Sequence, residues 1–305
     1  MRHSELDYGH YLHVILLTGR SGLKRDSASR SLDILSMQKL VPHYVEKPWG
    51  RTDLPLIFAA GAGRQIGEVW FESADGCDLP LLVKYIFTSD RLSIQVHPDD
   101  VQAVAKGLLR GKEEIWYVLD CEPGATLGIG LTAPMTPDQF RAAAQDGSLE
   151  QWIDWKPVKP GDCYFIPAGT VHAIGSGITL AEVQQNADVT YRLYDYGRPR
   201  ELHLDDGVAV SCLQPYDRAL IEAPLGHEVR LIGDDAAPFS LDLVHWSKDQ
   251  SISVPGGKAL WFTPLSGAGT VNGLSWEKGD CLLLEGDCAF TLTTSPVFAL
   301  LAIPR

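Results

Sequence analysis

Two polar side chains, Gln95 and His97, lie two residues apart in an otherwise apolar stretch that reads LSIQVHPDD over residues 92–100. The stretch is typical of a β-strand, in which residues i and i+2 point to the same face. We therefore expect Gln95 and His97 to face the interior together, with Ser93 in the same row. Polar groups where valine or leucine would be usual indicate that the two residues share a partner.

Two further segments supply polar groups of the same kind. Glu113 and Glu114 lie in GKEEIWYVL, and His172 lies in IPAGTVHAIG. Two imidazoles, a carboxylate and an amide oxygen form a donor set for a divalent metal such as zinc, iron or manganese. A neutral amide ligand leaves more positive charge on the metal than a second carboxylate would, which favours Lewis-acid chemistry. Taken singly, each residue has a plainer interpretation: a hydrogen-bonded core histidine, a surface carboxylate or an ordinary strand residue.

The elements that carry these residues are mostly short β-strands. Runs rich in β-branched and aromatic residues, bounded by Gly, Pro and Asp, follow one another from about residue 55, and many short strands with frequent turns predict a sandwich or barrel. The predicted strands are EVWFES, LPLLVKYIFT, LSIQVH, EIWYVLD, DCYFIPA, TLAEVQQ and VTYRLYDY.

Two helices interrupt this pattern. The first is predicted within PDDVQAVAKGLL, which opens with a proline and two cap-type residues. The second lies in TPDQFRAAAQDG, with Thr136 as N-cap, Pro137 at the first helical position and Gly147 as the stop. SLEQWIDW adds a further turn or two.

An internal similarity predicts a second barrel. Residues 158–174 and 276–292 share a Gly-Asp-Cys turn followed by a strand, and self-similarity of this kind indicates repeated units. The second copy has Ala289 or Phe290 where the first has His172. We therefore predict a catalytic metal-binding barrel over residues 37–205 and, beyond a boundary in the polar stretch 196–206, a supporting barrel without a metal site over 206–305.

Residues 1–36 differ from the rest, with no clear period and a polar KRDSASRS centre. We expect them to be a dispensable extension, or to be untranslated because translation starts at Met37. The alternative is an ordered N-terminal arm.

Composition excludes several classes of protein. The 305 residues carry a net charge of -13, so the chain is a poor general binder of nucleic acid, and an anionic ligand would need a local basic pocket. The six cysteines form no CxxC pair, which favours a reduced, cytoplasmic protein. No apolar run approaches the roughly 18 residues of a membrane span.

The long motifs carry a family resemblance. LSIQVHPDD, GKEEIWYVLD and IPAGTVHAIGSGITLAEVQQNADVTYRLYDYGRP together resemble the type I mannose-6-phosphate isomerases, zinc enzymes of the cupin fold. The match runs in order through about residues 40–205, EKPWG fits the family's opening, and the short interval from Glu114 to His172 resembles the compact bacterial branch. The resemblance implies a mainly β fold of two cupin-type jelly-roll barrels with a few helices. It also implies one Zn²⁺ per chain, bound by Gln95, His97, Glu114 and His172.

One position departs from the family pattern. The family has Gly-Lys-Thr-Glu where this chain has Glu113 in place of threonine. Since only one of two neighbours in a strand can face the interior, we expect Glu114 to be the ligand and Glu113 to face outward or toward the rim.

The same resemblance places four more residues in the active site, and strand alternation adds a fifth. Lys112 and Arg192 match its basic positions, and a planar guanidinium suits phosphate or a developing enediolate oxygen. Glu182 and Asp188 match its acidic positions, where either could orient Arg192 or take part in proton transfer. Ser93 shares the face of Gln95 and could meet the phosphate.

The implied reaction is the interconversion of mannose 6-phosphate and fructose 6-phosphate through an enediol. The base stays open between a metal-bound water, a histidine and Glu182. The partner is a small hexose phosphate; neither nucleic acid nor a membrane is expected, and the sequence predicts no oligomeric state. A non-catalytic sugar-phosphate-binding cupin is the alternative, although it would not need Arg192 and Lys112. A cupin oxygenase is a third possibility, against which Gln95 argues.

Overall fold

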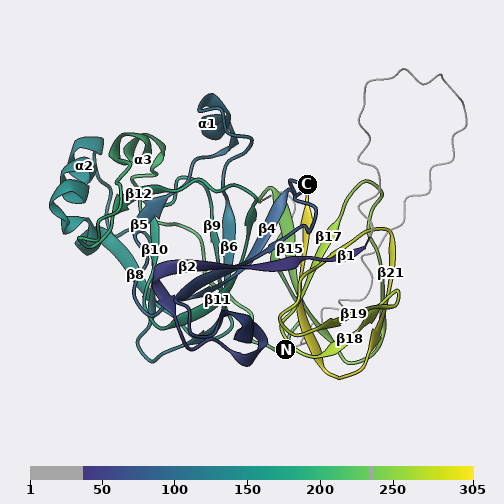
Figure 1. Cartoon of the computed structure of the whole chain (residues 1–305). Helices are drawn as coiled ribbons and strands as arrows, with labels where there is room; N and C mark the ends of the chain where they lie inside the picture. Colours follow the sequence, from purple (N-terminus) through teal and green to yellow (C-terminus); the bar gives the residue numbers. More distant parts are fainter. Residues whose placement is uncertain (1–36, 234–235) are drawn as a thin grey trace, which may run out of the picture. The chain divides into compact units, whose positions relative to one another are not determined.

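Residues 37–233 and 236–305 are described by a computed structural model (Figure 1). The expectations for residues 1–36 lie outside this part of the chain. The described residues form antiparallel sheets with three short α-helices, namely α1 (Asp100–Ala105), α2 (Pro137–Asp146) and α3 (Leu204–Val210), and two 3-10 helices, η1 (Leu56–Gly61) and η2 (Ser148–Trp152).

The first barrel consists of two sheets with a shared apolar interior. Its seven-stranded sheet has the order β13 (Ile221–Glu222), β9 (Asp162–Ile166), β6 (Glu114–Cys121), β11 (Ile178–Gln185), β4 (Leu81–Phe87), β3 (Ile66–Glu72) and β2 (Val41–Arg51). Its five-stranded sheet has the order β12 (Tyr191–Tyr194), β5 (Ile94–Val96), β10 (His172–Ile174), β7 (Thr126–Leu131) and β8 (Ile153–Pro157). Side chains of both sheets, including Trp116 and Ile129, pack in one core cluster between them.

The second barrel repeats this arrangement. Its six-stranded sheet has the order β1 (Gln38–Lys39), β20 (Leu282–Leu284), β17 (Leu260–Pro264), β22 (Val297–Pro304), β15 (Phe239–Trp246) and β14 (Val229–Ile232). Its four-stranded sheet has the order β16 (Gln250–Ser253), β21 (Asp287–Leu292), β18 (Ala268–Val271) and β19 (Leu274–Glu277). Phe262 and Phe290 belong to the core cluster that joins these two sheets.

Strand β4 shows how the two barrels share apolar surface. All seven of its residues are buried, because its two faces belong to different cores. Val83 and Tyr85 pack in a cluster that also contains Trp261 and Leu300 of the second barrel, whereas Ile86 packs inside the first barrel. A strand covered on both faces reads as a continuous apolar run, which explains LPLLVKYIFT and makes its one lysine conspicuous.

The predicted helices are present. Asp99 and Thr136 each close a capping box at the start of α1 and α2, Pro137 is the first residue of α2, and Gly147 ends it with φ 83°. The first helix is shorter than its sequence pattern, ending at Ala105. In Figure 1, α2 and α3 lie beside β5, β8, β10 and β12, and Phe140 of α2 shares a core cluster with residues of those strands.

The internal similarity corresponds to one repeated turn. Asp162 and Asp280 each accept a hydrogen bond from the backbone N–H three residues earlier, at 3.0 and 2.8 Å. Gly161 and Gly279, which precede them, have φ of 90° and 91°. This left-handed conformation is open to glycine at no steric cost, which explains why both copies carry Gly-Asp.

The chain still pairs with the first barrel beyond residue 206. The boundary between residues 205 and 206 falls inside α3, and β13 still pairs with β9 of the first barrel. At the other end, β1 pairs with β20 of the second barrel. Both pairings are long-range and leave no local pattern in the sequence. In the described part of the chain, no helix is long and apolar enough to cross a membrane.

Candidate active site

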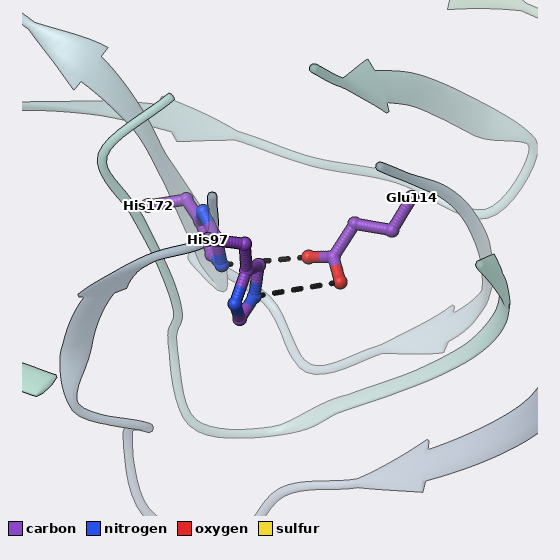
Figure 2. A group of neighbouring side chains, drawn as sticks. All are labelled: His97, Glu114 and His172. Atoms are coloured by element: carbon purple, nitrogen blue, oxygen red, sulfur yellow. Dashed lines mark ion pairs between the residues drawn. The ribbon is translucent and has the colours of Figure 1, made fainter. Parts of the chain in front are cut away.

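Three buried side chains converge inside the first barrel. His97 follows β5, Glu114 begins β6 and His172 begins β10; their ligand atoms all lie within 4.8 Å of one another. Glu114 Oε1 is 3.4 Å from His172 Nε2, and Oε2 is 3.6 Å from His97 Nε2. Figure 2 shows the carboxylate directed at both rings. The structure thus brings together residues from three distant parts of the sequence.

Backbone carbonyls fix the orientation of both histidines. His97 Nδ1 lies 2.7 Å from the carbonyl oxygen of Val189, and His172 Nδ1 lies 2.8 Å from that of Thr170. A carbonyl only accepts, so each Nδ1 donates and the Nε2 lone pair is left for a ligand. Burial lowers the pKa of His172 to about 4. Burial, followed by the charge of Lys112, also lowers the pKa of His97 well below its usual value. Both rings are therefore neutral, the form that binds a metal.

Gln95 lies next to the same point. It is opposite His172 in the strand register, and its Nε2 is 3.2 Å from His172 Nε2. Its Oε1 accepts from the hydroxyl of Ser93 at 3.4 Å. The amide oxygen and nitrogen exchange by a half-turn of the terminal torsion, so the oxygen can face the histidine nitrogens. The shared face predicted from LSIQVHPDD therefore places Gln95 beside His172 and brings in Ser93.

The residues present fit a divalent cation. Both carboxylate oxygens of Glu114 are buried without a hydrogen bond, and a buried carboxylate needs a cationic partner. The ammonium of Lys112 stands in for that partner, 3.0 Å from Glu114 Oε2 and 3.1 Å from His97 Nε2. Two neutral imidazole nitrogens and a carboxylate, with an amide beside them, form the donor set that zinc takes in proteins.

Glu113 lies away from this cluster. It is half-buried and borders a different hollow, together with Asp99 and Gln185. Its backbone N–H donates to Gln185 Oε1 at 3.0 Å, and burial raises the pKa of its side chain. Glu114 rather than its neighbour faces the histidines, as strand alternation predicts.

A polar pocket adjoins the cluster of His97, Glu114 and His172. Gln95 and Lys112 contact the cluster and also line the pocket, so they connect the two. All of the sequence-predicted residues outside the cluster line it, namely Ser93, Gln95, Lys112, Glu182, Asp188 and Arg192.

Arg192 supplies a cation with free hydrogen-bond donors. It is opposite Gln95 in the strand register; its Nη1 donates to the carbonyl of Glu201 at 2.8 Å, while its buried Nε has no partner. Burial lowers its pKa, with the nearby charge of Arg200 adding to the effect. A guanidinium with unused donors at a pocket is suited to an anion.

Glu182 lines the pocket, and its two carboxylate oxygens lie beside different groups. Its Oε2 accepts from the indole N–H of Trp116 at 3.0 Å. Its Oε1 has no hydrogen bond, although the ammonium of Lys84 lies 3.2 Å away. Burial raises the pKa of this carboxyl, and the charge of Glu114 adds to that shift.

Comparison with known proteins identifies the family. No family model matches the chain. The chain is 32% identical over 267 residues to the Bacillus subtilis protein named probable mannose-6-phosphate isomerase GmuF, covering 76% of this chain and 82% of that protein. This chain belongs to the mannose-6-phosphate isomerases. The family resemblance read from the motifs is thereby confirmed.

Solved structures of this isomerase family share the fold. The crystal structure of mannose 6-phosphate isomerase from Bacillus subtilis is 25% identical, with a TM-score of 0.72, over 88% of this chain and 99% of that one. A mutant of phosphomannose isomerase from Salmonella typhimurium, 17% identical, superposes with a TM-score of 0.60 over 88% of this chain and 99% of that one. The predicted mainly β, cupin-type architecture of the isomerase is confirmed.

Several residues that line the isomerase pocket were not predicted from the sequence. Arg200 forms a bidentate ion pair with buried Asp195, at 2.6 and 2.7 Å. The only sequence signal for this pair was an aspartate followed by arginines in YDYGRPR. Lys84 and Glu68 belong to no motif: Lys84 is the single charge of an apolar strand, and Glu68 is one of two glutamates on β3. The pocket residues missed by the sequence analysis are Lys47, Glu68, Trp70, Lys84, Ile86, Leu92, Trp116, Ile174, Thr190 and Arg200.

Proposed function

We propose that this isomerase interconverts mannose 6-phosphate and fructose 6-phosphate, with one Zn²⁺ held by Gln95, His97, Glu114 and His172. The observation that carries the proposal is the convergence of two neutral imidazole nitrogens and a buried carboxylate beside a pocket rich in cations. The names of the relatives supply the substrates, and the donor set favours zinc. When bound, the metal supplies Lewis-acid stabilisation of negative charge on the substrate oxygens.

Proton transfer is assigned to Glu182. Aldose–ketose isomerisation removes a proton from C2 of mannose 6-phosphate, forms an enediol and delivers a proton to C1. The two histidines are poorly placed for this, since each has its Nδ1 on a carbonyl and its Nε2 directed at Glu114. Glu182 lines the pocket, and its Oε1 is not taken up by the Trp116 N–H, so geometry favours this carboxylate as the base.

The cations divide the pocket into two ends. Lys112 lies beside Glu114, where its ammonium stabilises charge on the enediol oxygens. Arg192, with its unused donors, and Arg200 bind the phosphate, with the hydroxyl of Ser93 on the same wall. Asp188 is exposed and lines the pocket, where it meets sugar hydroxyls.

Glu182→Gln tests the assignment of the base. The variant keeps the shape of the side chain and can still accept the Trp116 N–H, but it cannot take up a proton. We expect zinc content to equal that of the wild type while kcat falls by roughly 10²- to 10⁴-fold, the usual contribution of a general base. Turnover close to that of the wild type would remove Glu182 from the mechanism.

A further inference from the structure

Asp195 is a buried carboxylate that binds two arginines. It follows β12 and is only 2% exposed. Its Oδ1 accepts hydrogen bonds from Arg198 Nε at 3.0 Å and from Arg198 Nη2 at 2.8 Å. Arg200 donates from Nε to Oδ2 at 2.6 Å and from Nη2 to Oδ1 at 2.7 Å. Four charge-assisted hydrogen bonds, the strong kind in proteins, thus converge on one carboxylate.

The two arginines differ in what else they contact. Arg198 donates from Nη2 to the carbonyl of Arg91 at 2.9 Å, and its Nη1 lies 3.4 Å from Asp90 Oδ2. Among the described residues, Arg200 lines the pocket whereas Arg198 does not. In the same part of the chain, Asp195 is the one partner found for the Arg200 guanidinium. The direction of Arg200 toward the pocket therefore depends on Asp195.

A tight turn sets the distance between the carboxylate and its arginines. The backbone N–H of Arg198 donates to the carbonyl of Asp195 at 3.0 Å, which closes a turn through Tyr196 and Gly197. These two residues have φ of 53° and 80°, as in a type I′ turn, and a left-handed tyrosine is uncommon. Its ring lies 4.1 Å from the Arg91 guanidinium and 5.5 Å from that of Arg198. These cation–π contacts stabilise the turn.

Asp195 also offsets repulsion between cations. Burial and then the charge of Arg200 lower the pKa of Arg192. The charge of Asp195 raises that pKa, and the charge of Arg198 lowers it again. The Arg200 side chain is 26% exposed, so it has a path to solvent. Without its anion, Arg200 would be repelled by the other two guanidinium groups and would leave the pocket.

We propose that Asp195 is a positioning residue for substrate recognition, which holds the Arg200 guanidinium at the pocket for the phosphate of the substrate. The inference rests on the proposed function, in which Arg192 and Arg200 bind that phosphate. Asp195 contacts neither the phosphate nor the reacting carbons in this account, because its oxygens are bound to the arginines. It acts through Arg200.

Geometry and charge predict opposite effects of removing this carboxylate. Asp195→Asn removes a negative charge near a site for an anion, which by charge alone would tighten the binding of phosphate. It also frees a long side chain, which must then be ordered each time a substrate binds. We expect the second effect to dominate, because the charge of an Arg200 that has turned to solvent is screened from the phosphate.

The test is steady-state kinetics with mannose 6-phosphate, with inorganic phosphate as inhibitor, for zinc-loaded wild type, Asp195→Asn, Arg200→Met and the double variant. Arg200→Met should raise KM and the inhibition constant Ki of phosphate at least about tenfold, since a charged hydrogen-bond partner is lost. Asp195→Asn should raise both by roughly 3- to 10-fold, with kcat close to that of the wild type. In the Arg200→Met background, Asp195→Asn should change Ki by less than about twofold.

Arg198→Met is the matched control, because it removes the other arginine from the same carboxylate. Its Ki should stay within about twofold of the wild type. An unchanged or lower Ki in folded Asp195→Asn overturns the role of Asp195. An equal rise in Arg198→Met, or a further rise in the double variant, also overturns it, since the effect would then not pass through Arg200.

A second comparison covers the case in which Asp195→Asn alone does not fold. The same substitution is then made in Arg198→Met, so that one negative and one positive charge are removed together, and Ki is compared with that of Arg198→Met. A raised Ki supports the role of Asp195 and an unmoved Ki overturns it. Failure of the proposed function is distinct, because Arg200→Met would then keep the KM and Ki of the wild type.

Discussion

Replacing Glu114 with glutamine should remove most of the affinity for zinc, and replacing Glu113 should not. The carboxylate of Glu114 is the single anion of the proposed ligand set and is 1% exposed, so solvent screens it little. Its oxygens lie 3.0 Å from Lys112 Nζ, 3.6 Å from His97 Nε2 and 3.4 Å from His172 Nε2. The variant keeps the size of the side chain and one oxygen donor, but it removes the negative charge.

The magnitude follows from the burial. Removing one partner from a buried charge pair costs about 3–5 kcal/mol. At about 1.4 kcal/mol per tenfold change, this corresponds to roughly a 10²- to 4 × 10³-fold weaker affinity for a cation. Glu113 is half-buried and borders a different hollow, and in the described part of the chain it forms no ion pair with His97 or His172. Glu113→Gln should therefore change zinc affinity by less than about twofold. This variant is the matched control for the loss of an acidic side chain.

The assay is a competition titration of metal-free protein with Zn²⁺ against a chromophoric chelator near neutral pH. Circular dichroism of each metal-free variant checks that the barrels are folded. Undiminished affinity in Glu114→Gln, or a larger loss in Glu113→Gln, would refute the choice between the two neighbours and the face assigned to β6.

Two further predictions concern the pocket and the reaction. Arg192→Ala should retain zinc but lower kcat/KM by roughly 10²- to 10³-fold, because a preorganised charge beside the substrate is lost; the measurement is steady-state kinetics with zinc content checked in parallel, and near-normal kinetics would remove Arg192 from the site. Isomerisation in D₂O should place deuterium on the product carbon that receives the proton, since a proton held by the Glu182 carboxylate can exchange with solvent. NMR of the product measures this incorporation, and a product without deuterium would favour direct hydride transfer over the enediol.

The local pattern predicted the part of the site that lies within single strands. Alternation in LSIQVHPDD placed Ser93, Gln95 and His97 on one face, and the same rule separated Glu114 from Glu113. Bringing His172 to the same point required the family motif, because its pairing with Gln95 spans 77 residues of sequence. Capping residues were sufficient for α2, whose signals are local.

The residues that were missed depend on register between strands. Lys84 is recognised as a pocket residue only from its position opposite Glu182 in the sheet, and a single lysine in an apolar run does not reveal that partner. The pairing of β13 with β9, which lies beyond the predicted boundary at residue 205, has no local signal either. Arg200 enters the pocket because buried Asp195 holds it, a contact within a loop of irregular backbone.

The most direct test of the central claim is a coupled assay of the purified protein with mannose 6-phosphate, before and after exhaustive chelation and after addition of Zn²⁺. The account predicts formation of fructose 6-phosphate, loss of that activity with the metal, and its return when about one Zn²⁺ per chain is restored. Full activity in protein shown to be metal-free, or no turnover in zinc-loaded protein, would contradict it.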